Sequence, residues 1–115
     1  MRALIVDDVE VGRYILRGYL EDMGYAVTDA ANEDQTRAAL QSGVYDLVML
    51  DWYLNDTTAE PLVFDIRNST SKKARIVVLS GVATDEEIQE IRKLGIDSFI
   101  GKPTTKDKVK QAVQV

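Results

Sequence analysis

Three short apolar runs, each stopped by a polar residue, constrain the fold of this chain most strongly. They occupy residues 3–6, 47–50 and 76–79, and the residues that follow them are Asp7, Asp51 and Ser80. Continuous apolar runs of this length predict strands buried on both faces, as in a parallel sheet. Two weaker strands are expected at 98–101 and at 26–30, where the mixed pattern is typical of an edge strand.

Helical patterns with recognisable ends lie between these runs. Helices are expected over 10–23, from Asn32 to Gly43, over 61–68, from Thr84 to Leu94, and from Thr105 to the end of the chain. Asn32 with Gln35, and Thr84 with Glu87, have capping-box spacing, and Gly24, Gly43 and Gly95 act as stop signals. The first helix carries Ile15, Tyr19 and Met23 four residues apart, and the fourth carries Ile88, Ile91 and Leu94.

Five strands that alternate with five helices through short loops predict a doubly wound α/β fold of the flavodoxin-like type. The expected parallel sheet has the strand order 2-1-3-4-5. Residues 1–115 are of a length that suits one domain, and 45% of them are hydrophobic, enough to build a single core.

The chain contains no cysteine and no histidine. This composition excludes disulfides, thiolate nucleophiles, zinc–thiolate sites, imidazole bases and histidine-ligated metals. The available chemistry is therefore that of carboxylates, hydroxyls, lysine and a metal that accepts oxygen ligands.

The formal charge is −5, and no run of lysine or arginine is present. An acidic surface argues against direct binding of nucleic acid or of anionic membranes. No apolar stretch approaches membrane length, and the first run stops at Asp7, so membrane insertion and a signal peptide are not expected. A cytoplasmic domain is the default expectation.

Polar residues at the strand ends predict a site. In the expected strand order, Asp7, Asp8 and Asp51 converge at the carboxyl edge of the sheet, where ligands of open α/β sheets bind. Three close carboxylates need a cation, and oxygen ligands favour Mg²⁺. Ser80 adds a hydroxyl and Lys102 a positive charge, the set of groups that phosphoryl transfer to a carboxylate requires. Each residue alone is more often a helix cap or a solvated side chain, but all of them at one edge favour a functional site.

With these residues the chain resembles the receiver domain of two-component response regulators, and it is chemotaxis-regulator-like. The resemblance rests on Val6-Asp7-Asp8, Leu50-Asp51, Leu79-Ser80-Gly81 and Phe99-Ile100-Gly101-Lys102-Pro103, and it covers essentially the whole chain.

The resemblance implies that Asp51 accepts a phosphoryl group from a phosphohistidine of a sensor histidine kinase or a histidine phosphotransfer protein. It implies that Asp7, Asp8, Asp51 and the backbone carbonyl of Tyr53 hold Mg²⁺, and that Lys102 pairs with the phosphoryl oxygens before a cis peptide bond to Pro103. Ser80 and Phe99 would then form the switch that rearranges the face of helix four, strand five and helix five for a downstream protein target. The domain would act as a signalling switch that catalyses only its own phosphorylation and dephosphorylation. On spacing alone, Phe99 is more simply a core aromatic.

Two positions depart from the family pattern. Asn55 and Ala59 replace the usual proline and glycine, so the loop from Leu54 to Glu60 is expected to differ in shape. Tyr53 and Val82 would flank the phosphoryl group, and neither is suited to orient an attacking water. A long-lived aspartyl phosphate is therefore expected.

Three other functions compete with this one. A pseudo-receiver, which would act as a phosphorylation-independent interaction module, is the main alternative. A phosphohydrolase of the haloacid-dehalogenase type would need a second Asp where Tyr53 stands. Nucleotide binding lacks its glycine motifs. A stand-alone regulator, a relay shuttle and a receiver from a longer protein all stay open, as does the oligomeric state.

Overall fold

The computed structural model describes residues 1–81 and 84–114. In chain order its elements are β1 (Arg2–Val6), α1 (Glu10–Asp22), β2 (Ala26–Ala30), α2 (Glu33–Ser42), β3 (Leu47–Asp51), β4 (Tyr53–Leu54), β5 (Thr57–Thr58), α3 (Glu60–Arg67), β6 (Arg75–Ser80), α4 (Asp85–Arg92), β7 (Ser98–Gly101) and α5 (Lys106–Val113). The expected helices and main strands are confirmed, with bounds that shift by one or two residues. No helix within the two described ranges is long and apolar enough to cross a bilayer.

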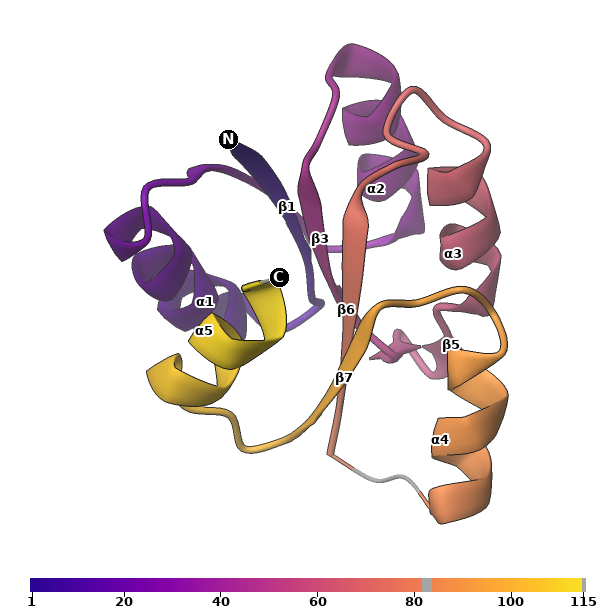
Figure 1. The fold of residues 1–115 in the computed structure, drawn as a ribbon. Coiled ribbons are helices and arrows are strands. Elements are labelled where there is room, and N and C mark those ends of the chain that lie inside the picture. Colours follow the sequence, from indigo (N-terminus) through magenta and orange to yellow (C-terminus); the bar gives the residue numbers. More distant parts are fainter. Residues whose placement is uncertain (82–83, 115) are drawn as a thin grey trace.

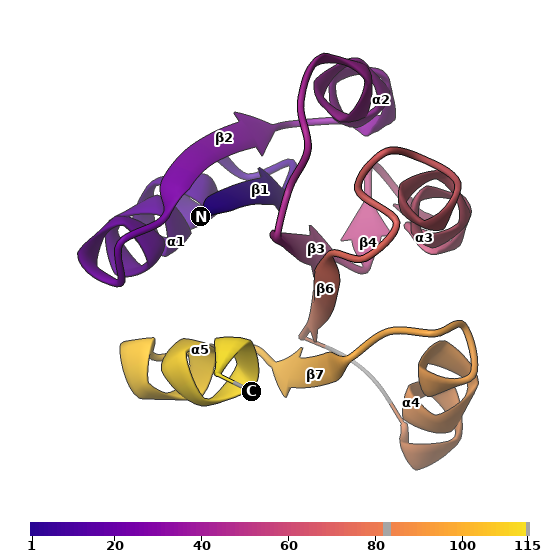
Figure 2. The ribbon, with the colours of Figure 1, turned by 45° about the horizontal axis from the view of Figure 1, so that its top comes forward.

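The main sheet has five parallel strands in the order β2-β1-β3-β6-β7. Counted along the main sheet alone, this is the predicted order 2-1-3-4-5, with β2 at an edge as expected. Helices α1 and α5 cover one face, and α2, α3 and α4 cover the other (Figures 1 and 2). The flavodoxin-like architecture is therefore confirmed.

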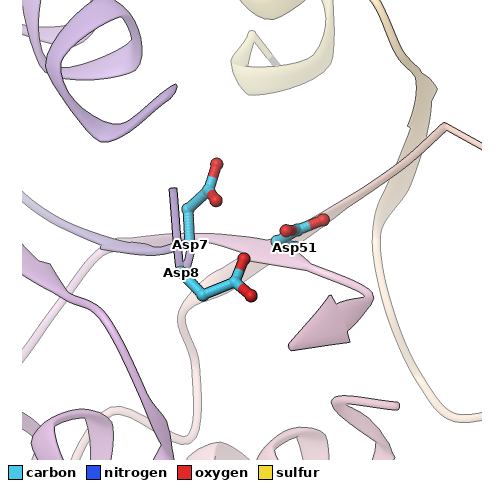
Figure 3. Close-up of side chains that lie close together, drawn as sticks. All are labelled: Asp7, Asp8 and Asp51. Atoms are coloured by element: carbon cyan, nitrogen blue, oxygen red, sulfur yellow. The ribbon is translucent and has the colours of Figure 1, made fainter. Parts of the chain in front are cut away.

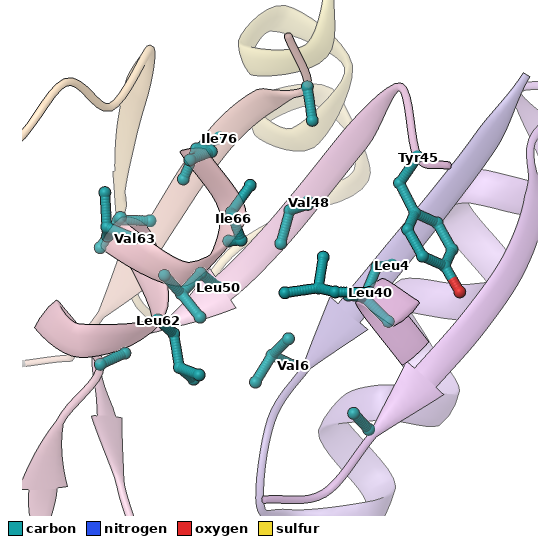
Figure 4. Packing of buried hydrophobic residues seen from close by; sticks show 14 of the residues in the cluster. Leu4, Val6, Leu40, Tyr45, Val48, Leu50, Leu62, Val63, Ile66 and Ile76 are labelled. Atoms are coloured by element: carbon teal, nitrogen blue, oxygen red, sulfur yellow. The ribbon is translucent and has the colours of Figure 1, made fainter. Parts of the chain in front are cut away.

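Alternate residues of each central strand supply two separate cores. Leu4, Val48 and Leu50 pack against α2 and α3 (Figure 4), whereas Leu47 and Met49 pack against α1 and α5. All five side chains are essentially inaccessible to solvent. Because successive side chains of a strand point to opposite faces, the apolar runs of the sequence are needed to fill both layers.

The buried face of α1 differs from the expected one. Leu16 and Leu20 are its buried residues, while Ile15 is 45% exposed and Tyr19 and Met23 are only partly buried against the core. Side chains one residue apart on a helix point in directions that differ by about 100° around the helix axis. Which apolar stripe is buried therefore depends on how the helix packs against the sheet. The expected stripe was therefore wrong by one position.

A two-stranded antiparallel hairpin that the sequence analysis did not predict separates β3 from α3. Tyr53 pairs with Thr58, and Leu54 pairs with Thr57. The two turn residues, Asn55 and Asp56, both have positive φ, of 48° and 67°. Turns of this kind favour Asn, Asp and Gly at both central positions, which explains the local sequence. The loop at 54–60 was expected to differ in shape, and the hairpin is the form that it takes.

Candidate acidic phosphoryl-acceptor site

Parallel pairing of β1 with β3 brings the three predicted carboxylates together. Val6 is in register with Leu50, so the next residue along each segment, Asp7 after β1 and Asp51 at the end of β3, lies at the same edge of the sheet. One carboxylate oxygen each from Asp7, Asp8 and Asp51 lies within 4.8 Å of the other two. Figure 3 shows the three side chains grouped at the ends of β1 and β3, with those of Asp7 and Asp8 diverging from adjacent backbone positions.

Lys102 reaches the same site from the end of β7. Ser80 is in register with Gly101, and the Lys102 amide donates to the Ser80 carbonyl at 2.8 Å. Its Nζ lies 3.0 Å from Asp51 Oδ1 and 3.9 Å from Asp7 Oδ2. The predicted cis peptide bond between Lys102 and Pro103 is present. Three strands therefore contribute charged groups to one pocket.

Backbone amides fix the two N-terminal carboxylates. Asp7 Oδ1 accepts a hydrogen bond from the Val9 amide at 2.9 Å, and Asp8 Oδ2 accepts one from the Asn55 amide at 3.1 Å. The Arg13 guanidinium donates to the backbone carbonyl of Asp7 at 2.8 Å. Asp7 is buried and Asp8 is exposed. The two acids are thus held in place before any ligand binds.

The absence of a side chain at Gly12 leaves room for the Asp7 carboxylate. A Cβ at this position would lie 2.7 Å from Asp7 Oδ2, closer than real contacts allow. Even alanine at this position would therefore force the Asp7 carboxylate to move.

Helix capping does not account for these strand-end residues. The N-cap residues of α1, α3 and α4 are Val9, Ala59 and Thr84, none of which is a predicted site residue. Thr84 accepts from the Glu87 amide as its capping-box spacing predicts. The alternative of plain caps is therefore wrong for Asp7, Asp8, Asp51 and Ser80.

Burial gives the Asp51 carboxylate an unusually high pKa. Removal from water raises the pKa of Asp51 from 3.8 to about 6, the nearby Lys102 opposes this change, and the charges of Asp7 and Asp8 add to it. Asp51 is 7% exposed, so its charged form depends on the positive groups placed around it.

The donor set fits a hard divalent cation. Within the described part of the chain, Asp7, Asp8 and Asp51 are the one acidic cluster whose oxygen atoms are spaced for a shared ion. Every ligand atom is an oxygen, as Mg²⁺ and Ca²⁺ require, and a cation would stabilise the charged form of Asp51, whose pKa is raised mainly by burial and further by the charges of Asp7 and Asp8.

The remaining predicted residues lie around this cluster. Ser80 is buried at the end of β6, and Phe99 in β7 is partly buried and packs against the α2–α3–α4 core. Tyr53 in β4 is 45% exposed, and its hydroxyl donates to Glu87 at 3.2 Å, which raises the pKa of the Tyr53 phenol. Val82 lies outside the described residues.

Sequence reasoning missed the backbone donors. The Asn55 amide becomes available because this position is not proline, and the Asn55-Asp56 pair between β-favouring residues was the signal for its turn. The roles of Val9, Gly12 and Arg13 left no pattern in the sequence from which they could be found.

A doubly wound parallel sheet with an acid cluster and a lysine at its carboxyl edge defines the class of this protein. Residues 3–114 match the family model described as the response regulator receiver domain. The chain belongs to this family and is the receiver domain of a two-component response regulator.

Known proteins resemble the chain over nearly its whole length. Chemotaxis protein CheY of Pseudomonas aeruginosa is 28% identical, over 99% of this chain and 94% of that protein.

Among solved structures, a response regulator of Burkholderia pseudomallei superposes with a TM-score of 0.90 and 28% identity, over 99% of this chain and 66% of that longer one. That crystal contains a phosphorylated aspartic acid, a calcium ion and citrate. The receiver domain of sensor histidine kinase PA1611 from Pseudomonas aeruginosa shares the fold, with a TM-score of 0.82 and 21% identity over 96% of this chain and 91% of that one. In that structure a magnesium ion is coordinated in the active-site cleft.

Proposed function

We propose that this domain is a phosphorylation switch in which Asp51 accepts a phosphoryl group from a phosphohistidine on a partner protein. The observation that carries the proposal is the buried Asp51 carboxylate with the Lys102 ammonium at 3.0 Å and two further carboxylates beside it. Receiver domains interact with histidine kinases or phosphotransfer proteins and with downstream targets, so the partner is expected from one of those two donor classes.

The reaction requires little chemistry from the chain itself. An Asp51 carboxylate oxygen attacks phosphorus as the phosphorus–nitrogen bond of the donor breaks, and the electron pair of that bond stays on the imidazole nitrogen. Lys102 stabilises the charge on the transferring oxygens, and the buried setting strengthens this interaction. The product is an acyl phosphate whose phosphoryl oxygens carry more negative charge than the Asp51 carboxylate did, so the cations around this buried position are needed to stabilise it.

Asp7, Asp8, Asp51 and the backbone carbonyl of Tyr53 would hold Mg²⁺. When bound, this ion supplies positive charge that offsets the repulsion between the phosphoryl oxygens and the carboxylates. The Val9 and Asn55 amides orient Asp7 and Asp8 for this role. The divalent ions reported in the two similar structures support the proposal.

Ser80 and Phe99 connect the site to the outer surface. Ser80 would donate to the phosphoryl group, and Phe99 would turn toward the space that Ser80 leaves. The face formed by α4, β7 and α5 would then change its affinity for a downstream protein. The domain is thus a signalling switch rather than an enzyme that acts on free substrates, and we expect it to work in the cytoplasm.

Intact-mass measurement tests the proposal. The protein is mixed with Mg²⁺ and acetyl phosphate, or with a phosphorylated kinase, and a gain of one phosphoryl mass is expected. Asp51→Asn should abolish the gain, whereas Asp34→Asn, which neutralises an exposed acid in α2, should keep it. A protein that gains no mass under either donor would instead be the phosphorylation-independent interaction module.

A further inference from the structure

A groove between α3 and α4 lies on the side of the sheet away from α1 and α5. Figures 1 and 2 both place α3 and α4 beside one another on this face. The groove consists of two adjoining cavities of about 660 and 450 Å³, and Glu60 and Leu94 line both of them. We call it the α3–α4 groove.

The groove has an apolar floor with an aromatic ring at either end. Trp52 and Ile91 form buried parts of the floor. Phe64 is 69% exposed at the α3 end, and Tyr53 is 45% exposed at the end near the acidic site. An aromatic side chain as exposed as Phe64 beside a groove is typical of a surface that a partner covers.

Carboxylates outnumber cations along this groove. Its described lining includes the four glutamates Glu60, Glu86, Glu87 and Glu90. Lys93 is already paired with Glu90 at 3.0 Å. Arg67 is held by Asp97 at 3.1 Å and by backbone carbonyls. Most of the negative charge therefore has no fixed counter-charge within the described residues.

We propose that the α3–α4 groove docks a basic, amphipathic segment of a partner protein. Arginine or lysine side chains would pair with Glu60 and Glu86, compete with Lys93 for Glu90, and lie over the Phe64 ring, since a cation is attracted to an aromatic face. Apolar side chains from the same segment would fill the floor over Trp52 and Ile91. The proposal does not depend on phosphorylation of Asp51, because all of these groups are in place without it.

A labelled amphipathic helical peptide, with arginine on one face and leucine on the other, is the probe. A matched peptide carries glutamate at every arginine position. Fluorescence anisotropy should show saturable binding of the arginine peptide that weakens as salt is added. Amide chemical shifts should move at residues 60–64 and 86–94 and stay constant in α1 and α5.

Two surface variants define the contribution of the groove. Glu86→Gln combined with Glu90→Gln removes two carboxylates and releases Lys93, so binding should weaken about three- to tenfold. Phe64→Ala should weaken binding by a similar factor. Asp107→Asn, an equal loss of charge on exposed α5, is the matched control and should bind like the parent protein.

Several outcomes would overturn the proposal. These are equal binding of the glutamate peptide, shift changes centred on α1 or α5, and an effect of the double variant no larger than that of Asp107→Asn. Sedimentation that shows self-association lost in Phe64→Ala would assign the groove to a second copy of the chain instead. Circular dichroism of each variant confirms that the fold is retained.

Discussion

The Lys102 ammonium lies 3.0 Å from Asp51 Oδ1, although about half of the chain separates the two residues. Burial raises the pKa of the Asp51 carboxylate and Lys102 lowers it. In the proposed reaction, Lys102 is the group that would neutralise an incoming phosphoryl oxygen. Lys102→Met should therefore slow phosphorylation by acetyl phosphate about 100-fold, the loss typical of one stabilising charge donor. Lys110→Met, on α5, is the control, and a rate in Lys102→Met within a factor of two of the parent would contradict the assigned role.

The raised pKa of Asp51 predicts a pH-dependent stability. Below the ordinary value of 3.8 the carboxyl is protonated in both folded and unfolded chains, so no charge is buried. Between pH 3.8 and about 6 the unfolded chain has lost this proton while the folded chain keeps it, so the free energy of unfolding falls as the pH rises, and above about 6 the full loss of about 3 kcal/mol at most is reached.

Asp51→Asn removes this titration. In the presence of a chelator, the variant should be more stable than the parent at pH 7, and the difference should shrink toward pH 4. Urea unfolding at a series of pH values measures it, with Asp34→Asn as the control for a surface charge. A difference that does not vary with pH would show that burial of the Asp51 charge is not its origin.

The geometry of the β4–β5 turn predicts that one substitution at Asn55 destabilises the protein and that another does not. Asn55→Pro removes the amide that donates to Asp8 and cannot adopt a φ of 48°, so it should cost about 1–3 kcal/mol of stability. Asn55→Gly keeps the amide and favours positive φ, so it should stay close to the parent.

The affinity for Mg²⁺ should also depend on the Asn55 amide, because this amide orients Asp8. Trp52, the one tryptophan of the chain, is buried next to Asp51 and should report ion binding through its fluorescence. Asn55→Pro is expected to weaken Mg²⁺ binding severalfold because Asp8 loses its orientation. Equal affinities in the proline and glycine variants would rule out the Asn55 amide as a positioning group.

The position of the Tyr53 ring beside the acidic site predicts a long lifetime for the phosphorylated state. Tyr53→Asn should shorten the half-life of the aspartyl phosphate severalfold, since asparagine can orient a water and the aromatic ring no longer screens the site. Tyr53→Phe keeps the ring and removes only the hydrogen bond to Glu87, so its half-life should match the parent. Mass spectrometry of phosphoryl loss over time measures these half-lives. An unchanged half-life in Tyr53→Asn would contradict the proposed role of Tyr53 in screening the site.

The main sheet and its strand order were predictable because a strand buried on both faces appears in the sequence as a continuous apolar run. Strands such as β3 must be apolar at every position, and a polar residue such as Asp51 then marks the strand end. Convergence of Asp7, Asp51 and Lys102 follows from the strand order alone, so the centre of the site was predictable from the same apolar runs.

The other contacts of the site and the buried face of α1 could not be predicted, because no sequence pattern marks the groups that make them. Backbone amides such as those of Val9 and Asn55 are present at nearly every residue, so only the folded geometry selects the ones that bind a carboxylate. The choice of Leu16 over Ile15 on α1 likewise depends on how the helix lies on the sheet. The Tyr53–Glu87 hydrogen bond joins two segments whose approach is set by tertiary packing.

Because β3 is buried on both faces, the position of Asp51 is independent of the exposed helix residues that a partner would contact. Asp51 is positioned by a strand whose side chains are anchored alternately in both hydrophobic layers, so its location does not depend on the outward faces of any one helix. The solvent-facing residues of the helices can therefore diversify to suit new partners while the proposed acceptor, Asp51, keeps its place. A single reactive edge can in this way serve many signalling routes, each distinguished only by what is displayed around it.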